Sequence, residues 1–310
     1  MAIRVLMCAL LLGLSGCADF KVAAEFGRQT TKMTGVVKDE FAQMEAQCRA
    51  QAELVAKTAD IPDDAPLDDC KRYQAAQGAL AAATVEVLDN YARALAAVAD
   101  GETFDLSPDL DGLGGRLDGL KDRAGNPLID ARESNAIDKL AVALADAWAA
   151  KRREDAVRRL VAEVPDLALT GRVLKSYFVE TADAPSGRSK APYTNLVAIA
   201  GSSVRSTEAL LASPAMRRAE PIRTYELRQE AERREAFLRA RGAQFGRPGE
   251  VPVARDQLVQ TRIADAIDAW LAALDRFSAD ALSADPKALY DQLKLLGSKT
   301  LAARKAVAGL

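Results

Sequence analysis

The spacing of its apolar residues limits this chain to a helical fold more strongly than any other feature. Apolar residues recur at steps of three, four or seven along most of the 310 residues, which places them on one face of an α-helix. No series of alternating apolar and polar residues of the kind that predicts β-strands runs through the chain. The clearest seam, of the kind that packs against a neighbouring helix, consists of Val259, Ile263, Ile267, Trp270, Leu274 and Phe277.

The same spacing predicts most of the helices. They cover residues 19–57, 67–99, 132–163, 193–211 and 214–242, followed by the seam near the C-terminal end and a final helix from Pro286. A weaker pattern predicts a short helix within 107–120, and residues 166–178 fit either a helix or a strand. The large residues expected on inner faces include Tyr91, Trp148, Trp270 and Leu301.

Composition agrees with this assignment. Alanine is abundant and only 5% of the residues are aromatic, which favours helices that pack closely through small side chains. We therefore expect an all-α fold, an elongated antiparallel bundle of about seven or eight helices.

The N-terminal residues have the organisation of an export signal. Arg4 precedes the almost wholly apolar run 5–14, which is shorter than the about 20 residues needed to span a bilayer but suits the apolar region of a secretory signal. The residues that follow this run, Leu14-Ser15-Gly16-Cys17, resemble the lipobox of bacterial lipoproteins. An ordinary secretory signal is the alternative.

The resemblance implies a lipid anchor. It implies cleavage before Cys17, attachment of diacylglycerol to the Cys17 sulfur and acylation of the new amine. Three acyl chains hold a protein on a membrane far more firmly than one. In Gram-negative lipoproteins an Asp directly after the Cys tends to retain the protein at the inner membrane. This position is Ala18, so the resemblance implies the periplasmic face of the outer membrane, with the inner membrane as the alternative.

Two further cysteines remain, Cys48 and Cys70, because Cys8 falls in the signal. In an oxidising compartment their simplest arrangement is a disulfide, here one that pins the neck of a helical hairpin. The alternative is a metal or redox pair, but two thiols without a nearby His make a poor zinc site.

These boundaries divide the chain into four parts. Residues 1–16 form the signal, 17–100 an N-terminal helical hairpin, 101–130 a connector rich in Gly and Asp, and 131–310 a C-terminal helical bundle. The hairpin and the bundle can also form one continuous domain.

The absence of His excludes whole classes of enzyme. A Ser-His or Cys-His nucleophile, a His-ligated zinc ion and a His general base are all impossible, and no Ser-x-x-Lys spacing occurs. The formal net charge of −2 argues against a nucleic-acid partner. No catalytic residue, metal ligand or cofactor is therefore predicted.

An arginine-rich tract over residues 217–241 is the candidate partner surface. Guanidinium groups bind carboxylates and phosphates bidentately, so the tract could meet anionic lipid, peptidoglycan or an acidic protein. The preferred interpretation is a solvated helix with pairs one turn apart, such as Glu230 with Arg233 and Arg234. The candidate contacts are Arg217, Arg218, Arg223, Arg228, Arg233 and Arg234.

A second pattern, at residues 122–133, partly resembles an EF-hand calcium loop. Ala124 stands at the place of a ligand and Pro127 at the place of the turn glycine. A turn followed by a helix that Asp130 caps, with Glu133 three positions later, accounts for the same residues.

These observations favour a non-enzymatic, lipid-anchored helical protein that presents a surface to another envelope protein, as an adaptor or an envelope-maintenance factor. One alternative is a periplasmic carrier with an apolar ligand in the bundle interior. A more remote one is a hydrolase of envelope glycans that uses two carboxyl groups, although no placement singles out such a pair.

Overall fold

The structure, a computed structural model, describes residues 2–59, 65–104, 113–150, 152–186, 188, 191–212, 221–245, 253–280 and 286–309. Within these ranges some side chains, among them those of residues 2–19 and 51–59, are not described. The helices are α1 (Ala2–Ala59), α2 (Ala65–Tyr73), α3 (Ala79–Asp100), α4 (Leu113–Leu117), α5 (Ala131–Trp148), α6 (Arg153–Ala162), α7 (Val164–Phe178), α8 (Pro192–Leu211), α10 (Pro221–Arg239), α11 (Val259–Asp280) and α12 (Pro286–Ala308).

The all-α prediction is confirmed, since the described residues form eleven α-helices and no strand. The predicted number of seven or eight helices is too low. The helix predicted over 67–99 is divided into α2 and α3 by one π-helical turn at Gln74–Gly78, and the helix predicted over 132–163 is interrupted between α5 and α6. Residues 166–178, for which a strand was the alternative, belong to α7.

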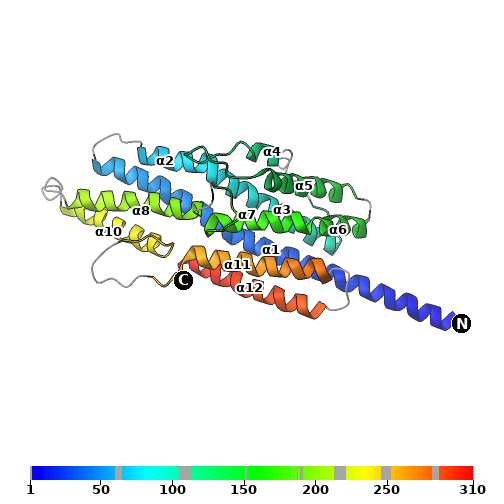
Figure 1. Ribbon diagram of the computed structural model, residues 1–310. Coiled ribbons are helices and arrows are strands. Elements are labelled where there is room, and N and C mark those ends of the chain that lie inside the picture. Colours follow the sequence, from blue (N-terminus) through cyan, green and yellow to red (C-terminus); the bar gives the residue numbers. More distant parts are fainter. Residues whose placement is uncertain are drawn as a thin grey trace.

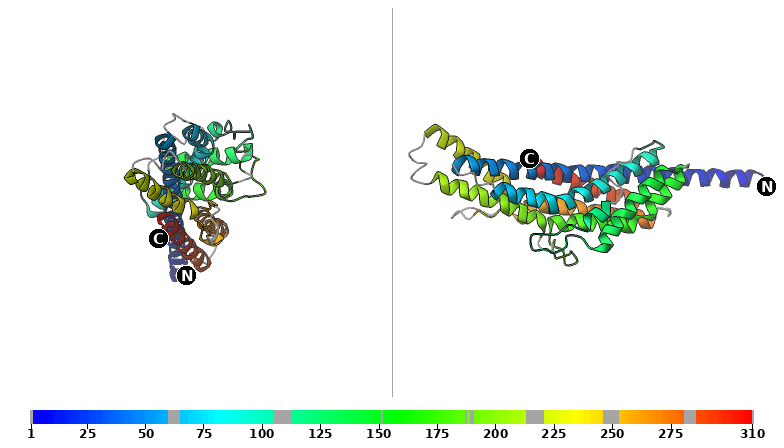
Figure 2. Two further views of the ribbon diagram at one scale, coloured as in Figure 1. Left: turned by 90° about the vertical axis from the view of Figure 1, so that its left-hand side faces the viewer. Right: turned by 90° about the horizontal axis from the view of Figure 1, so that it is seen from above.

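The helices lie roughly along one axis and form an elongated bundle (Figures 1 and 2). Helix α1 is its central element, because it packs against α3, α8, α11 and α12. Helices α11 and α12 pair with each other, while α5 and α6 pack on the side of α3 and α7. The core of the described residues is continuous, since a single cluster of buried apolar side chains extends from Val22 to Val307.

Aromatic side chains fill the contact between α1 and α11. The rings of Phe26 and Phe277 stack with their centroids 4.9 Å apart. Trp270, predicted to face inward, is fully buried, and its Nε1 donates a hydrogen bond of 2.9 Å to the Thr30 hydroxyl. Because a buried indole N–H needs an acceptor, this bond fixes the ring orientation as well as satisfying the donor.

Two residues predicted to face inward are exposed instead. Trp148 is 62% exposed and Leu301 is 54% exposed. In both helices a smaller neighbour occupies the seam, Ala147 in α5 and Thr300 in α12, and both of these are buried. A large apolar residue one position away from the seam points about 100° away from it, since an α-helix has 3.6 residues per turn.

A glycine allows α1 to approach α3 closely. A Cβ atom on Gly27 would lie 2.5 Å from the carbonyl oxygen of Ala92 and 2.9 Å from the Cβ of Ala96. The contact agrees with the predicted close packing through small side chains. Gly35, two turns further along α1, has no neighbouring atom within 4 Å of the equivalent position.

Alanine at these two positions is therefore expected to have opposite effects. Gly27→Ala should lower the free energy of unfolding by about 1–3 kcal/mol, because the backbone of α3 has to move away. Gly35→Ala should raise it by about 0.5–1 kcal/mol, because Ala has the higher helix propensity and meets no obstacle. Urea unfolding followed by circular dichroism measures both values, and two changes of the same sign would contradict this packing.

Candidate functional site

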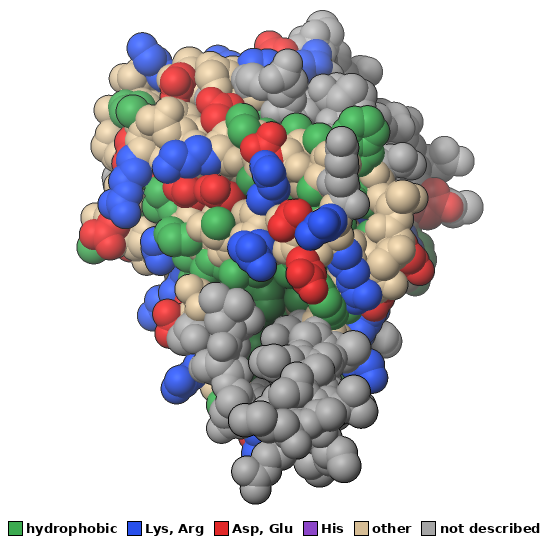
Figure 3. Space-filling model, turned by 90° about the vertical axis from the view of Figure 1, so that its right-hand side faces the viewer, with side chains coloured by type: hydrophobic (Ala, Val, Ile, Leu, Met, Phe, Trp, Pro, Cys, Tyr) green, Lys and Arg blue, Asp and Glu red, His purple; other side chains and the backbone are tan. Residues whose placement is uncertain are grey.

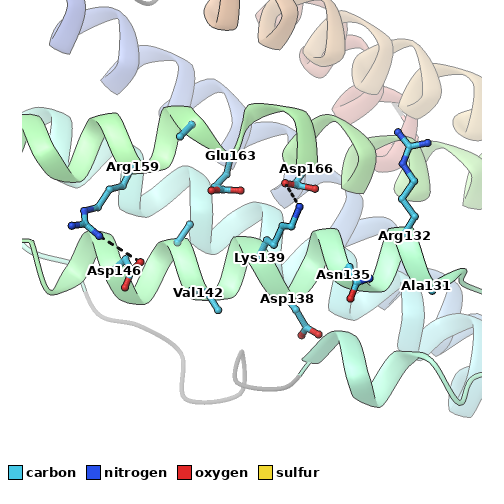
Figure 4. Close-up of a pocket in the computed structure, with 12 residues that line it drawn as sticks. Ala131, Arg132, Asn135, Asp138, Lys139, Val142, Asp146, Arg159, Glu163 and Asp166 are labelled. Atoms are coloured by element: carbon cyan, nitrogen blue, oxygen red, sulfur yellow. Dashed lines mark hydrogen bonds and ion pairs between the residues drawn. The ribbon is translucent and has the colours of Figure 1, made fainter.

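An open groove of about 810 Å³ lies between α5 and the helices α6 and α7 (Figure 4). Helix α5 begins with a capping box, as predicted. The Asp130 carboxylate accepts a hydrogen bond from the Glu133 N–H, and the Glu133 carboxylate accepts one from the Asp130 N–H. Residues 122–133 therefore form a turn and a capped helix start, and Glu133 is further held by the buried guanidinium of Arg188 at 2.6 Å.

The opposite wall of the groove is interrupted at Glu163. This residue lies between α6 and α7, and Pro165 occupies the first turn of α7. Proline is tolerated there because the N–H groups of a first turn have no intrahelical acceptor. The groove is lined by Ala131, Arg132, Asn135, Asp138, Lys139, Val142, Ala143, Asp146, Arg159, Ala162, Glu163 and Asp166.

Charges of both signs surround an apolar side chain in this groove. Val142 of α5 is 61% exposed. Around it, Lys139 Nζ donates to Asp166 at 3.4 Å, and Arg159 pairs with Asp146 at 3.5 Å (Figure 4). Exposed pairs of this kind contribute only about 0–1 kcal/mol, so their partners can be exchanged at little cost.

Glu163 and Asp166 form a pair of carboxyl groups at the rim. Burial raises the pKa of the Glu163 carboxyl above its ordinary value, and a hydrogen bond with Asp166 and the charge of Asp166 raise it further. The positive charge of Lys139 lowers the pKa of Glu163 and so opposes these effects. A carboxyl of raised pKa beside a second carboxylate is an arrangement that general acid catalysis uses.

Glu163→Gln is expected to stabilise the protein at pH 7. A raised folded-state pKa means that Glu163 contributes stability below its unfolded pKa and loses this contribution as the pH rises through the folded pKa. Glutamine cannot ionise, so the variant should be more stable at pH 7, by less than about 1 kcal/mol at this partly exposed site, and equal to the wild type below about pH 4. Urea unfolding at both pH values measures the difference. The same change in an Asp166→Asn background should have less effect, and an effect that is independent of pH would contradict the pairing.

The candidate residues at Cys17, Cys48 and Cys70 lie along the first two helices. The side chain of Cys17 lies outside the described part of α1. Cys48 of α1 and Cys70 of α2 form a disulfide with their Cα atoms 5.9 Å apart.

Within α10 the arginine-rich tract forms pairs along its own helix, whereas Arg241, which follows α10, binds Glu40 of α1. Arg217 and Arg218 lie outside the described residues, as does the side chain of Arg223. Arg228 lines a second groove, between α8 and α10. The expected pairs are present, since Glu230 binds Arg233 at 3.0 Å and Arg234 at 2.7 Å.

A buried polar cluster was not predicted from the sequence. The Glu40 carboxylate of α1 accepts hydrogen bonds from the Arg241 guanidinium at 2.8 and 2.9 Å and from the Tyr193 hydroxyl. Both charged side chains are almost completely buried. Burial raises the pKa of Glu40, against the opposing charge of Arg241. The sequence contained one sign that Glu40 is buried. Glu40 lies three residues after Val37 and four before Met44, which places it on the inner face of the helix.

The described residues offer no group of three or more His, Cys, Asp or Glu side chains that could hold a metal ion. Within the same part of the chain, no helix is both long and apolar enough to cross a membrane. No protein-family model, curated protein or solved structure matches the chain.

Proposed function

We propose that the protein is a non-enzymatic, lipid-anchored adaptor of the bacterial envelope, held by acylated Cys17 on the periplasmic face of the outer membrane, and that the groove between α5 and α6–α7 binds a partner protein. The lipobox-like residues 14–17 support the anchor. The observation that carries the partner site is the exposed Val142 among charges of both signs.

The lining of the groove indicates the chemistry of the partner. An apolar contact at the centre with a polar rim is the usual composition of a protein interface. Three basic and four acidic side chains line the groove, so a ligand of one charge sign would meet repulsion as well as attraction. A polypeptide segment that carries an apolar side chain flanked by acidic and basic ones complements this lining.

The two alternative functions, a glycan hydrolase and a carrier of an apolar ligand, are less well supported by the structure. The Glu163 and Asp166 pair favours the hydrolase, but the groove is open to solvent, and water weakens electrostatic catalysis. A carrier needs an apolar interior space, whereas the described core around Phe26 and Trp270 is filled by packed aromatic rings.

Crosslinking in living cells tests the partner site. A photo-crosslinking amino acid at Val142 is expected to give one discrete adduct with a second protein. The same amino acid at Leu301 of α12, which is comparably exposed at 54%, should not give this adduct. Val142→Arg should abolish co-purification of the adduct partner, and Leu301→Arg should leave it intact. Identical adducts at the two positions would refute a specific groove.

Two further measurements separate the alternatives. Intact mass of the protein from membranes should show cleavage before Cys17 and added acyl chains, and an unmodified Cys17 would refute the anchor. Hydrolysis of isolated sacculi that is lost in Glu163→Gln would instead support the hydrolase.

A further inference from the structure

One end of the bundle brings together the beginning of the described side chains of α1, the end of α5 and the beginning of α6. The Arg153 guanidinium lies over the Phe20 ring, 4.1 Å from its centroid. Trp148, the last residue of α5, is 62% exposed, and Arg152 is exposed as well. Figure 3 looks onto this end, where hydrophobic side chains lie among basic and acidic ones. We call the surface formed by Phe20, Trp148, Arg152 and Arg153 the anchor end.

The short distance along the chain to Cys17 determines where the anchor end lies. This step rests on the proposed lipid anchor. A chain spans at most about 3.6 Å per residue, so the three residues from Cys17 to Phe20 extend over no more than roughly 11 Å. The polar layer of a bilayer is itself several ångströms thick on each side. A lipidated Cys17 therefore holds the anchor end against the headgroups.

The exposed side chains of the anchor end have the chemistry that binds lipid headgroups. Tryptophan is enriched at membrane interfaces because its ring is apolar and its indole N–H is a donor. A guanidinium binds phosphate oxygens with two parallel hydrogen bonds. Arg152 has no ion-pair partner among the described residues, so its guanidinium is available for this contact.

We infer that the anchor end docks on phospholipid headgroups, with Trp148 in the interfacial layer and Arg152 on a lipid phosphate, so that the bundle stands on the membrane by this end. The Phe20 and Arg153 pair joins α1 to α6 immediately above the anchor. It therefore keeps Trp148 and the tether on the same side of the molecule.

Fluorescence of Trp148 tests this docking, because the only other tryptophan, Trp270, is fully buried. The lipidated protein, purified from membranes, is reconstituted into vesicles of phosphatidylcholine and phosphatidylglycerol with or without bromine on the acyl chains near the headgroup. The bromine is expected to remove the Trp148 part of the emission. The emission of Trp148→Phe should remain unchanged, and Arg152→Glu should weaken the quenching.

Helix α10, at the opposite end of the bundle, provides a matched control (Figure 1). Its Tyr225 is also 62% exposed. Tyr225→Trp in the Trp148→Phe background is expected to escape quenching. Equal quenching at both positions, or none at Trp148, overturns the docking.

Vesicle flotation and intact mass report on the anchor separately. Protein that floats with an acylated Cys17 but shows no Trp148 quenching retains the anchor and refutes the docked end. An unmodified Cys17 together with failure to float refutes the proposed anchoring as well.

Discussion

Arg241→Met is expected to lower the free energy of unfolding by about 3–5 kcal/mol, the largest effect of any single substitution considered for this protein. The change leaves the Glu40 carboxylate buried without its counter-charge. It also removes hydrogen bonds from the Arg241 guanidinium to the Phe237 and Val307 carbonyl oxygens. Urea unfolding at pH 7, followed by circular dichroism, measures the loss.

Two variants show whether the buried charge is the cause. Arg233→Met removes an arginine whose partner is on the surface and should change the stability by less than about 1 kcal/mol. Adding Glu40→Met to Arg241→Met should recover much of the loss, because no charge then remains buried. Failure of the double variant to recover would assign the loss to packing alone.

The loss in Arg241→Met should also depend on pH. Arg241 opposes the effect of burial on the Glu40 pKa, so its removal raises that pKa further. A raised folded-state pKa gives a contribution that is present at low pH and is lost as the pH rises. The difference between variant and wild type is therefore expected to be smaller at pH 5 than at pH 8.

Removing the disulfide with Cys48→Ala and Cys70→Ala is expected to lower the free energy of unfolding by roughly 3 kcal/mol in the chain-entropy model. The bond joins residues 22 positions apart and ties α1 to α2, so its loss lets the unfolded chain explore more conformations. Unfolding in urea with and without a reductant measures the effect.

The reductant provides the control for this prediction. It should destabilise the wild type to the level of the double variant and leave the variant itself unchanged. If the protein is exported as proposed, it meets an oxidising compartment, so protein isolated from the envelope should contain the bond and protein expressed in the cytoplasm should lack it. A wild type that reductant does not affect would contradict the stabilising role.

Much of the fold could be predicted from the sequence because large side chains mark the seams of its helices. Trp270 and Tyr91 lie where their spacing places them. The spacing of large apolar residues fails to predict the buried face where small residues form it, as at Ala147 and Thr300. Alanine and threonine are hard to recognise as buried residues when larger ones, Trp148 and Leu301, directly follow them in the sequence. The break between α5 and α6 was missed because the connecting residues 149–152 include neither Gly nor Pro, the usual signals of a helix end.

The candidate groove could not be predicted in the same way. Its lining comes from α5 on one side and α6–α7 on the other, and only the packing of these helices brings Val142 near Glu163. Buried charges were missed for a related reason. A Glu at an inner position such as Glu40 is tolerated only when a distant residue, here Arg241, supplies its counter-charge, and periodicity contains no information on such pairs.

The length of α1 has a consequence for where binding can take place. From Phe20 to Ala59 the helix extends roughly 60 Å at 1.5 Å per residue. In the proposed anchored state, with Cys17 in the outer membrane, this length sets the distance of each part of the bundle from the lipid surface. In that state the α8–α10 end would lie far from the membrane, while the groove beside α5 would begin within a few turns of the lipid surface. The proposed partner of the groove would then have to reach a fixed distance from the bilayer, so that this distance as well as its sequence would decide whether it binds.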